Sequence, residues 1–255
     1  MLPLYDDHPT GRSPIVSYGL ISVCVLVFLW QESLGPRTAE EVVLAFGMVP
    51  AVLFGHAALP PRLELVPAWS TLLTSTFLHG GWLHLLGNML YLWLFGRGVE
   101  TALGSWRFFL FYPFCGAAAA LVQAAMDPDA TVPMIGASGA IAGTLGGYLV
   151  LYPRGNVVVL IWVLFFVRLV TVPAVIMLGL WFLLQLTSAV SAPPGEPGVA
   201  FWAHVAGFVV GTMAVAAFRH PRVSRSNPPR ILNRRGGGSV PSAGRPRHRV
   251  PDRWG

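Results

Sequence analysis

Apolar residues gather in six runs, and polar or turn-forming residues separate one run from the next. A helix needs about 20 apolar residues to cross a membrane, because its backbone N–H and C=O groups find no partners in hydrocarbon and must bond within the helix. The pattern therefore predicts six transmembrane helices. They cover residues 15–33, 82–98, 106–126, 137–153, 172–190 and 198–218.

A seventh apolar stretch, residues 156–170, contains Arg168 and is too short before that arginine to cross a membrane comfortably. Charge decides between six spans and seven, because the inner connections of a membrane protein are enriched in Arg and Lys. With six spans and an inner N-terminus, all 17 basic residues except Arg37 and Arg62 lie inside. A seventh span would carry Arg168 and the C-terminal arginines to the other side. We therefore expect residues 156–170 to form an apolar hairpin or an interfacial element on the inner side.

The connection between the first two spans, from about residue 34 to residue 70, is long and combines glutamates with apolar patches. It lies outside in this arrangement. Connections of this length without regular structure are often functional, and we expect this one to dip into the membrane edge. The predicted fold class is an all-α membrane protein, a six-helix bundle with a long loop between spans one and two.

Composition supports a membrane protein rather than a soluble domain, since 54% of residues are hydrophobic, 11% are charged and the mean hydropathy is +0.61. Cys24 and Cys115 fall inside apolar runs, which indicates packing residues rather than a disulfide. The net charge of +6 belongs mainly to residues 219–255, which hold 10 of the arginines among six Pro and five Gly. We expect this tail to be disordered and to contact anionic lipid head groups, with no nucleic-acid partner.

The chain thus divides into a short cytoplasmic N-terminus (residues 1–13), a membrane domain (14–218) and a cytoplasmic tail (219–255). The first span follows acidic residues and leads into Gln31 and Glu32 without a small-residue cleavage site, which favours a retained span over a signal peptide. We expect a multi-pass protein of a bacterial cell (inner) membrane, since no transit-peptide features precede the first span.

Among the polar residues inside the predicted spans, four stand out, and because polar side chains are costly there these are candidates for function. His84 and Asn88 are in the second span, Ser138 begins the fourth and His204 is in the sixth. These spans run in the same direction, so the four residues lie at one depth in the outer half of the membrane. Singly, each could serve packing or a bond to a neighbouring carbonyl. Their convergence on three parallel helices indicates a site.

The four side chains have the chemistry that acyl transfer needs. Ser138 follows Gly136 and Ala137 where a helix begins, so free N–H groups and the helix dipole favour a developing oxyanion. The imidazole of His204 is the natural base for the Ser138 hydroxyl. His84 and Asn88 are four residues apart and offer two donors from one helix face. Small residues that let the fourth and sixth helices approach are Gly139, Gly143, Gly146, Gly147, Gly207 and Gly211.

Three short motifs resemble the signatures of the rhomboid intramembrane proteases: His84-Leu-Leu-Gly-Asn88, Gly136-Ala-Ser138-Gly139 and Ala203-His204-Val-Ala-Gly207. The resemblance covers about residues 14–218 and includes Gly98-Val-Glu100. It implies a six-helix bundle and a serine endopeptidase that cleaves single-span or otherwise membrane-anchored proteins in or next to their transmembrane segment, without a cofactor or metal.

The resemblance also implies a role for each residue. Ser138 is expected to be the nucleophile and His204 the general base, with no acidic third member. The side chains of His84 and Asn88 and the backbone N–H of Ser138 are expected to bind the oxyanion. His79 and Gly136 are possible accessory residues.

Two positions depart from the family pattern. Trp69 is followed by Ser70 and Thr71, where many relatives have a Trp-Arg pair. Ala142 occupies the place, four residues after the nucleophile, where many relatives carry a Tyr that stacks on the base. Another side chain must therefore support His204.

Two other functions are open to such a sequence. One is a catalytically silent rhomboid-like protein that binds membrane clients, against which the intact Ser138 and His204 pair argues. The other is a metal transporter or metalloprotease that uses His79, His84 and His204. The sequence has no His-Glu-x-x-His motif and no carboxylate at span depth, which argues against a metal.

Overall fold

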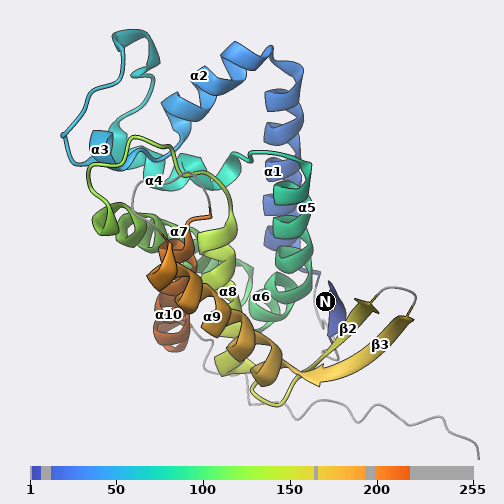
Figure 1. Ribbon diagram of the computed structural model, residues 1–255. Helices are drawn as coiled ribbons and strands as arrows, with labels where there is room; N and C mark the ends of the chain where they lie inside the picture. The colour runs from blue at the N-terminus through green and yellow to red at the C-terminus, as the bar shows by residue number, and fades with distance from the viewer. Residues whose placement is uncertain (1, 7–12, 164–165, 193–198, 219–255) are drawn as a thin grey trace, which may run out of the picture.

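The computed structural model describes residues 2–6, 13–163, 166–192 and 199–218, and these residues are mostly helical (Figure 1). The predicted basic tail, residues 219–255, lies outside the described residues. The longer helices are α1 (Ile15–Ser33), α2 (Pro36–Phe46), α5 (Trp82–Tyr91), α6 (Arg97–Leu103), α7 (Ser105–Met126), α8 (Ser138–Leu151), α9 (Ala174–Ser191) and α10 (Phe201–Phe218).

Each of the six predicted apolar runs is largely helical. By length and composition, four helices among the described residues could cross a membrane: α1, α7, α9 and α10. The second run is built from α5, the π-helical segment η4 (Leu92–Gly96) and α6, and the fourth is the shorter apolar helix α8. That all six runs are membrane spans stays a prediction.

The prediction of an all-α fold is wrong, because the chain forms a three-stranded antiparallel sheet. Its strands are β1 (Leu2–Asp6), β2 (Asn156–Val163) and β3 (Phe166–Pro173), in the order β1-β2-β3. Of the two alternatives for residues 156–170, the hairpin is the one observed, and it is a β-hairpin in which Val157 pairs with Val172. Runs of β-branched residues favour strands, but hydropathy alone does not separate a short apolar strand from a helix.

The sheet is attached to one end of the helices (Figure 1). Val157 and Val159 of β2 are buried in the main core. Asp6 of β1 accepts a hydrogen bond from the Tyr148 hydroxyl at 2.9 Å, and Arg97 Nη2 lies 4.0 Å from its carboxylate. Part of the predicted cytoplasmic N-terminus is therefore a structural edge strand, which sequence reasoning did not find.

The segment between α1 and α5 lies at the opposite end from the sheet (Figure 1) and has more regular structure than the sequence indicated. Besides α2 it contains α3 (Pro50–Leu53), α4 (Thr71–Thr74) and the 3₁₀ turns η1 (Pro61–Leu63), η2 (Ala68–Ser70) and η3 (Ser75–Phe77). Glu41 of α2 lies 3.2 Å from the Arg62 guanidinium and so joins α2 to η1.

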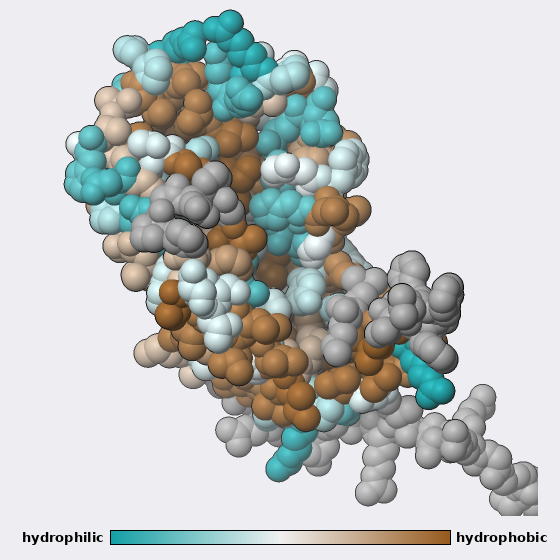
Figure 2. Space-filling model, in the orientation of Figure 1, coloured by the Kyte–Doolittle hydropathy of each residue, from teal (hydrophilic) through white to brown (hydrophobic). Residues whose placement is uncertain are grey.

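The outer surface of the helices is apolar, as a lipid-facing surface must be. Figure 2 shows hydrophobic residues over the lower half of the molecule in this view and hydrophilic residues around the end that carries α2. The exposed large apolar residues of α9 are Val175, Ile176, Leu180, Leu183, Leu184 and Val190. Exposure of this many aliphatic side chains on one helix is expected where the neighbour is lipid rather than water.

Helix α8 is the centre of the bundle, since every residue from 139 to 148 is buried. Its glycines meet α10 at backbone distance, as the sequence predicted. A Cβ on Gly207 would overlap the carbonyl oxygen of Gly139, and one on Gly211 would overlap that of Gly143. The two helices therefore contact each other with no space for a side chain between them.

The buried carboxylate of Glu100 caps the first helix from a distant part of the chain. Pro14 precedes α1 and supplies no side-chain cap. Glu100, in α6, accepts hydrogen bonds from the backbone N–H groups of Val16 (3.0 Å) and Ser17 (2.7 Å) and from the hydroxyls of Ser17 (2.8 Å) and Ser105 (2.6 Å). An acceptor at a helix N-terminus satisfies N–H groups that have no partner within the helix. Glu100 thus joins α1, α6 and α7.

Replacing this carboxylate should destabilise the fold. We expect Glu100→Ala to lower the free energy of unfolding by ~3 kcal/mol, because the buried Ser17 and the half-buried Ser105 lose the acceptor of their hydroxyl groups. Denaturant titration in detergent micelles measures the change. Glu40→Ala, at an exposed glutamate of α2, is the matched control and should change stability by less than ~0.5 kcal/mol. Equal unfolding curves for the two variants would contradict the capping role.

Candidate active site

Ser138 is the first residue of α8 and is half-buried. The chain reaches it through Gly136, which has φ +119°, a conformation that side-chain-bearing residues rarely adopt. The Gly136 N–H donates to the Ser75 carbonyl at 2.8 Å and so holds this turn against η3. No hydrogen bond joins the Ser138 hydroxyl to any other described residue, so the hydroxyl is available at the helix start.

His84 and Asn88 of α5 converge on the backbone just before Ser138. A Cβ built on Gly136 would lie 2.6 Å from His84 Nε2 and 3.6 Å from Asn88 Nδ2. The Gly80 N–H donates to His84 Nδ1 at 3.4 Å, so in the neutral imidazole the proton is on Nε2, the atom that faces Gly136. Both side chains therefore present N–H donors to one point, as their spacing predicted.

The Asn88 Nδ2 donor has no hydrogen-bond partner among the residues that the structure describes. Asn88 is 9% exposed, and its Nδ2 is fully buried without a hydrogen bond among the described residues. Buried polar groups are nearly always paired, so an unpaired one needs an explanation, and a group that arrives only during a reaction is one. An anionic oxygen beside Gly136 would fill that position.

His204 lies in the first turns of α10 and is buried. Its preceding residue, Ala203, packs against Gly139, the residue after Ser138: a Cβ on Gly139 would lie 3.8 Å from Ala203 Cβ. Ser138 precedes Gly139 and His204 follows Ala203, so the contact between Gly139 and Ala203 brings their neighbours Ser138 and His204 into the same region.

A small cavity of about 10 Å³ lies at this junction, with Ser138, Gly136, Gly139 and Ala203 among its lining residues. A single water needs roughly 10–15 Å³ of such space. The site in this conformation therefore has room for about one water molecule.

His79 lies behind His84 rather than in the site. It is 2% exposed, its ring meets that of His84 edge-on with centroids 5.2 Å apart, and its Nδ1 is 3.3 Å from the Phe77 carbonyl oxygen. The Gln31 amide oxygen accepts from the His79 backbone N–H at 3.1 Å. Burial, with a smaller repulsion from His84, lowers the pKa of His79 to about 4, so its imidazole is neutral near pH 7.

Sequence reasoning missed two glutamines that contact the sixth predicted span. Gln185 Oε1 of α9 lies 2.7 Å from His204 Nδ1, and Gln123 Oε1 of α7 accepts the Ala203 backbone N–H at 3.1 Å. The Trp181 ring is also beside the imidazole, with ring centroids 6.0 Å apart. Both glutamines are polar residues inside apolar runs, so the criterion that identified His84 and His204 would have found them.

The histidines do not form a metal-ligand set. In the part of the chain that the structure describes, no three His, Cys, Asp or Glu side chains are grouped so that they could hold a metal ion. This geometry does not support the hypothesis that His79, His84 and His204 bind a metal ion together.

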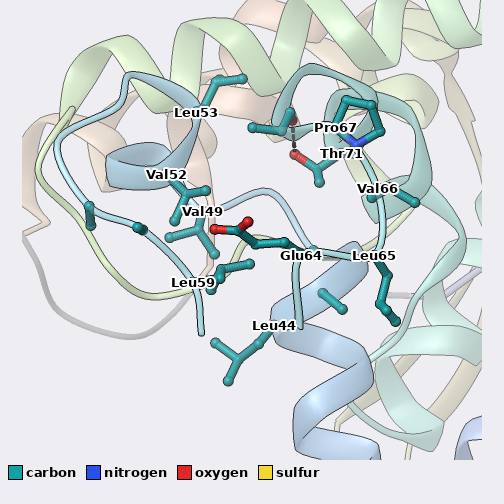
Figure 3. Close-up of a pocket in the computed structure, with 15 residues that line it drawn as sticks. Leu44, Val49, Val52, Leu53, Leu59, Glu64, Leu65, Val66, Pro67 and Thr71 are labelled. Atoms are coloured by element: carbon teal, nitrogen blue, oxygen red, sulfur yellow. Dashed lines mark hydrogen bonds between the residues drawn. The ribbon is translucent and has the colours of Figure 1, made fainter. Parts of the chain in front are cut away.

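A larger cavity, of about 520 Å³, lies away from these residues, in the segment between α1 and α5. Figure 3 shows its mainly aliphatic lining and the Glu64 side chain reaching toward Val49 and Val52. None of the predicted site residues lines it.

Comparisons with known proteins find relatives of one family. The family model described as Rhomboid domain matches residues 67–221. The chain is 35% identical over 136 residues to "Rhomboid protease GluP" of Bacillus subtilis, which covers 53% of this chain and 24% of that protein. It is 29% identical over 163 residues to "Rhomboid protein 1, mitochondrial" of Saccharomyces cerevisiae, and the match covers 62% of this chain and 41% of that protein. It is 40% identical over 81 residues to "Putative rhomboid protease YdcA" of Bacillus subtilis, covering 32% and 40%. The chain therefore spans less than half the length of these relatives.

Two glycine substitutions should separate the role of the α8 and α10 contact from a general effect of glycine. We expect Gly211→Ala to lower the free energy of unfolding by ~2 kcal/mol, because the added methyl group overlaps the Gly143 carbonyl and forces the helices apart. Gly179→Ala in α9, where a Cβ meets nothing within 4 Å, should instead raise stability by a few tenths to ~1 kcal/mol. Denaturant titration in micelles compares them. Equal shifts would contradict the close contact.

Proposed function

The chain belongs to the rhomboid family, and from this membership we propose that it is a serine-type intramembrane endopeptidase that cleaves membrane-anchored proteins in or next to their transmembrane segment. Its family and its apolar helices make it an integral membrane protein. Relatives named as proteases support peptide-bond hydrolysis at the level of the family.

The observation that carries the proposal is the pair of donors beside Gly136. His84 Nε2 and the unpaired Asn88 Nδ2 point at the backbone two residues before a hydroxyl at a helix N-terminus. Donors held in place before any charge develops stabilise an oxyanion without reorganisation, and one such donor is worth a few kcal/mol. A protein that only binds clients has no need for an unpaired buried donor at this point.

The proposed reaction has two halves. Ser138 Oγ attacks the carbonyl carbon of the scissile peptide while His204 takes the hydroxyl proton, and the carbonyl oxygen becomes an oxyanion held by His84, Asn88 and the Ser138 backbone N–H. The C–N bond then breaks, and His204 gives its proton to the leaving amine. Water, deprotonated by His204, hydrolyses the acyl-enzyme and frees Ser138.

The substrate must present an extended peptide to this site, so its helix has to unwind locally near the cleaved bond. Single-span or otherwise membrane-anchored proteins are the proposed substrates. The size of the cavity beside Ser138 requires a helix movement for entry, and α9, with few buried residues, is the element proposed to move. An inner-membrane location with both termini inside, and contact of the basic tail with anionic lipids, belong to the same proposal.

The serine mechanism is tested by single substitutions in purified protein reconstituted into liposomes with a single-span substrate. Ser138→Ala and His204→Ala should each abolish cleavage, because one removes the nucleophile and the other the base. Ser22→Ala, at an exposed serine of α1, is the matched control and should retain wild-type cleavage. A chelator should have no effect. Cleavage that persists in Ser138→Ala, or that the chelator stops, would refute the mechanism.

The oxyanion role of Asn88 is tested by kinetics. Asn88→Ala should lower kcat by about 10²–10³-fold and leave KM nearly unchanged, because its donor acts only when charge develops on the carbonyl oxygen. Gly87→Ala, on the adjacent position of α5 where a Cβ meets nothing within 4 Å, controls for disturbance of the helix. A rise in KM with kcat preserved would show that Asn88 binds substrate instead.

A further inference from the structure

One face of α9 packs against α10, and that face is mainly apolar. Phe182 lies with its ring centroid 4.8 Å from that of Phe208, and Trp181 is 6.1 Å from Phe208. Leu178 and Ala189 are buried on the same face. Helical spacing places Gln185 in this stripe, between Phe182 and Ala189. An amide in an apolar contact is costly unless it is hydrogen-bonded, so Gln185 needs a partner there.

That partner is the base of the proposed dyad. Gln185 Oε1 lies 2.7 Å from His204 Nδ1. An amide oxygen only accepts hydrogen bonds, so Nδ1 must carry the proton. In the neutral imidazole the lone pair is then on Nε2. The bond therefore selects one tautomer of His204 and holds the ring by one edge.

Selecting this tautomer matters for acyl transfer. A neutral imidazole takes a proton only at the nitrogen that carries the lone pair. If Nδ1 carried the lone pair instead, Nε2 would carry a hydrogen and could not accept the proton from the Ser138 hydroxyl. His84 shows the opposite case, because the Gly80 N–H occupies its Nδ1 and leaves Nε2 as a donor toward Gly136.

The chain has a specific need for such a residue. Ala142, where many family members have a Tyr against the base, carries only a methyl group, and that methyl faces α10 at Gly207. The two α9 side chains, Gln185 by its hydrogen bond and Trp181 by its ring, are the described groups that contact the His204 imidazole from the neighbouring helix.

We propose that Gln185 is the positioning residue for His204: its amide oxygen fixes the imidazole with the proton on Nδ1 and the lone pair on Nε2. The inference rests on the proposed function and adds to it. Because Gln185 belongs to α9, the base is correctly set only while α9 is packed against α10. A substrate that displaces α9 on entry therefore reacts after α9 has returned.

Kinetics of three variants in liposomes test the role. Gln185→Met keeps the length of the side chain but has no strong acceptor, and it should lower kcat at least about tenfold with little change in KM, because fewer molecules hold the productive tautomer and ring orientation. Gln185→Glu retains an oxygen acceptor and should restore at least half of the wild-type kcat. Thr187→Val removes a hydroxyl from the exposed face of the same helix and should leave kcat unchanged.

A tautomer measurement separates positioning from simple packing and does not depend on cleavage. In protein labelled with ¹⁵N-histidine, the nitrogen shifts of His204, assigned by their loss in His204→Ala, should show protonated Nδ1 in wild type, and Gln185→Met should move the ring toward the Nε2-protonated form. Unchanged shifts in Gln185→Met, or protonated Nε2 in wild type, would overturn the inference. So would a wild-type kcat in Gln185→Met.

The same set distinguishes the two proposals. An inactive wild-type protein whose His204 shifts respond to Gln185→Met would remove the proposed function and leave the tautomer control standing. An active wild-type protein whose His204 shifts do not respond to Gln185→Met would remove the tautomer control and leave the proposed function standing. If Gln185→Met does not fold in micelles, Gln185→Leu replaces it in both measurements.

Discussion

The close contact between α8 and α10 is the constraint on which the site depends. Gly139 and Gly143 meet Gly207 and Gly211 so closely that a single added methyl group would overlap a backbone carbonyl. Helices in lipid gain little from burying apolar surface against each other, so backbone proximity and van der Waals contact must hold them together. This contact brings the start of α8, with Ser138, beside the first turns of α10, with His204.

Around this contact, the half-buried His84 and the buried His204 favour opposite tautomers because of what each Nδ1 meets. The Gly80 N–H donates to His84, which leaves a proton on Nε2 toward Gly136, whereas Gln185 accepts from His204, which leaves a lone pair on Nε2. One residue type thus presents an N–H at one position and a lone pair at the other. Because each Nδ1 lies against a protein group, neighbouring groups rather than solvent choose the tautomer.

Much of the fold could be predicted because the bilayer imposes a simple rule on sequence. Helices occupy all six apolar runs, and the prediction of family membership is confirmed by the match over residues 67–221. The errors have a common cause. Residues 156–163 are mainly apolar and rich in β-branched side chains, and their pairing with Leu2–Asp6, some 150 positions away, is a non-local choice that hydropathy does not encode. The cap that Glu100 provides for α1 is non-local in the same way.

The sequence by itself determined which chemical groups the site contains, because a serine at a helix start, a histidine four residues from an asparagine and a second histidine among glycines are local patterns with fixed consequences. Only the tertiary structure decided the state in which those groups are held. Gly136 has to adopt a positive φ before His84 and Asn88 can reach one point, and α9 has to pack on α10 before Gln185 meets His204. Hydrogen bonds between residues on separate helices depend on how those helices pack, and the sequence of one helix does not specify which other helix it packs against.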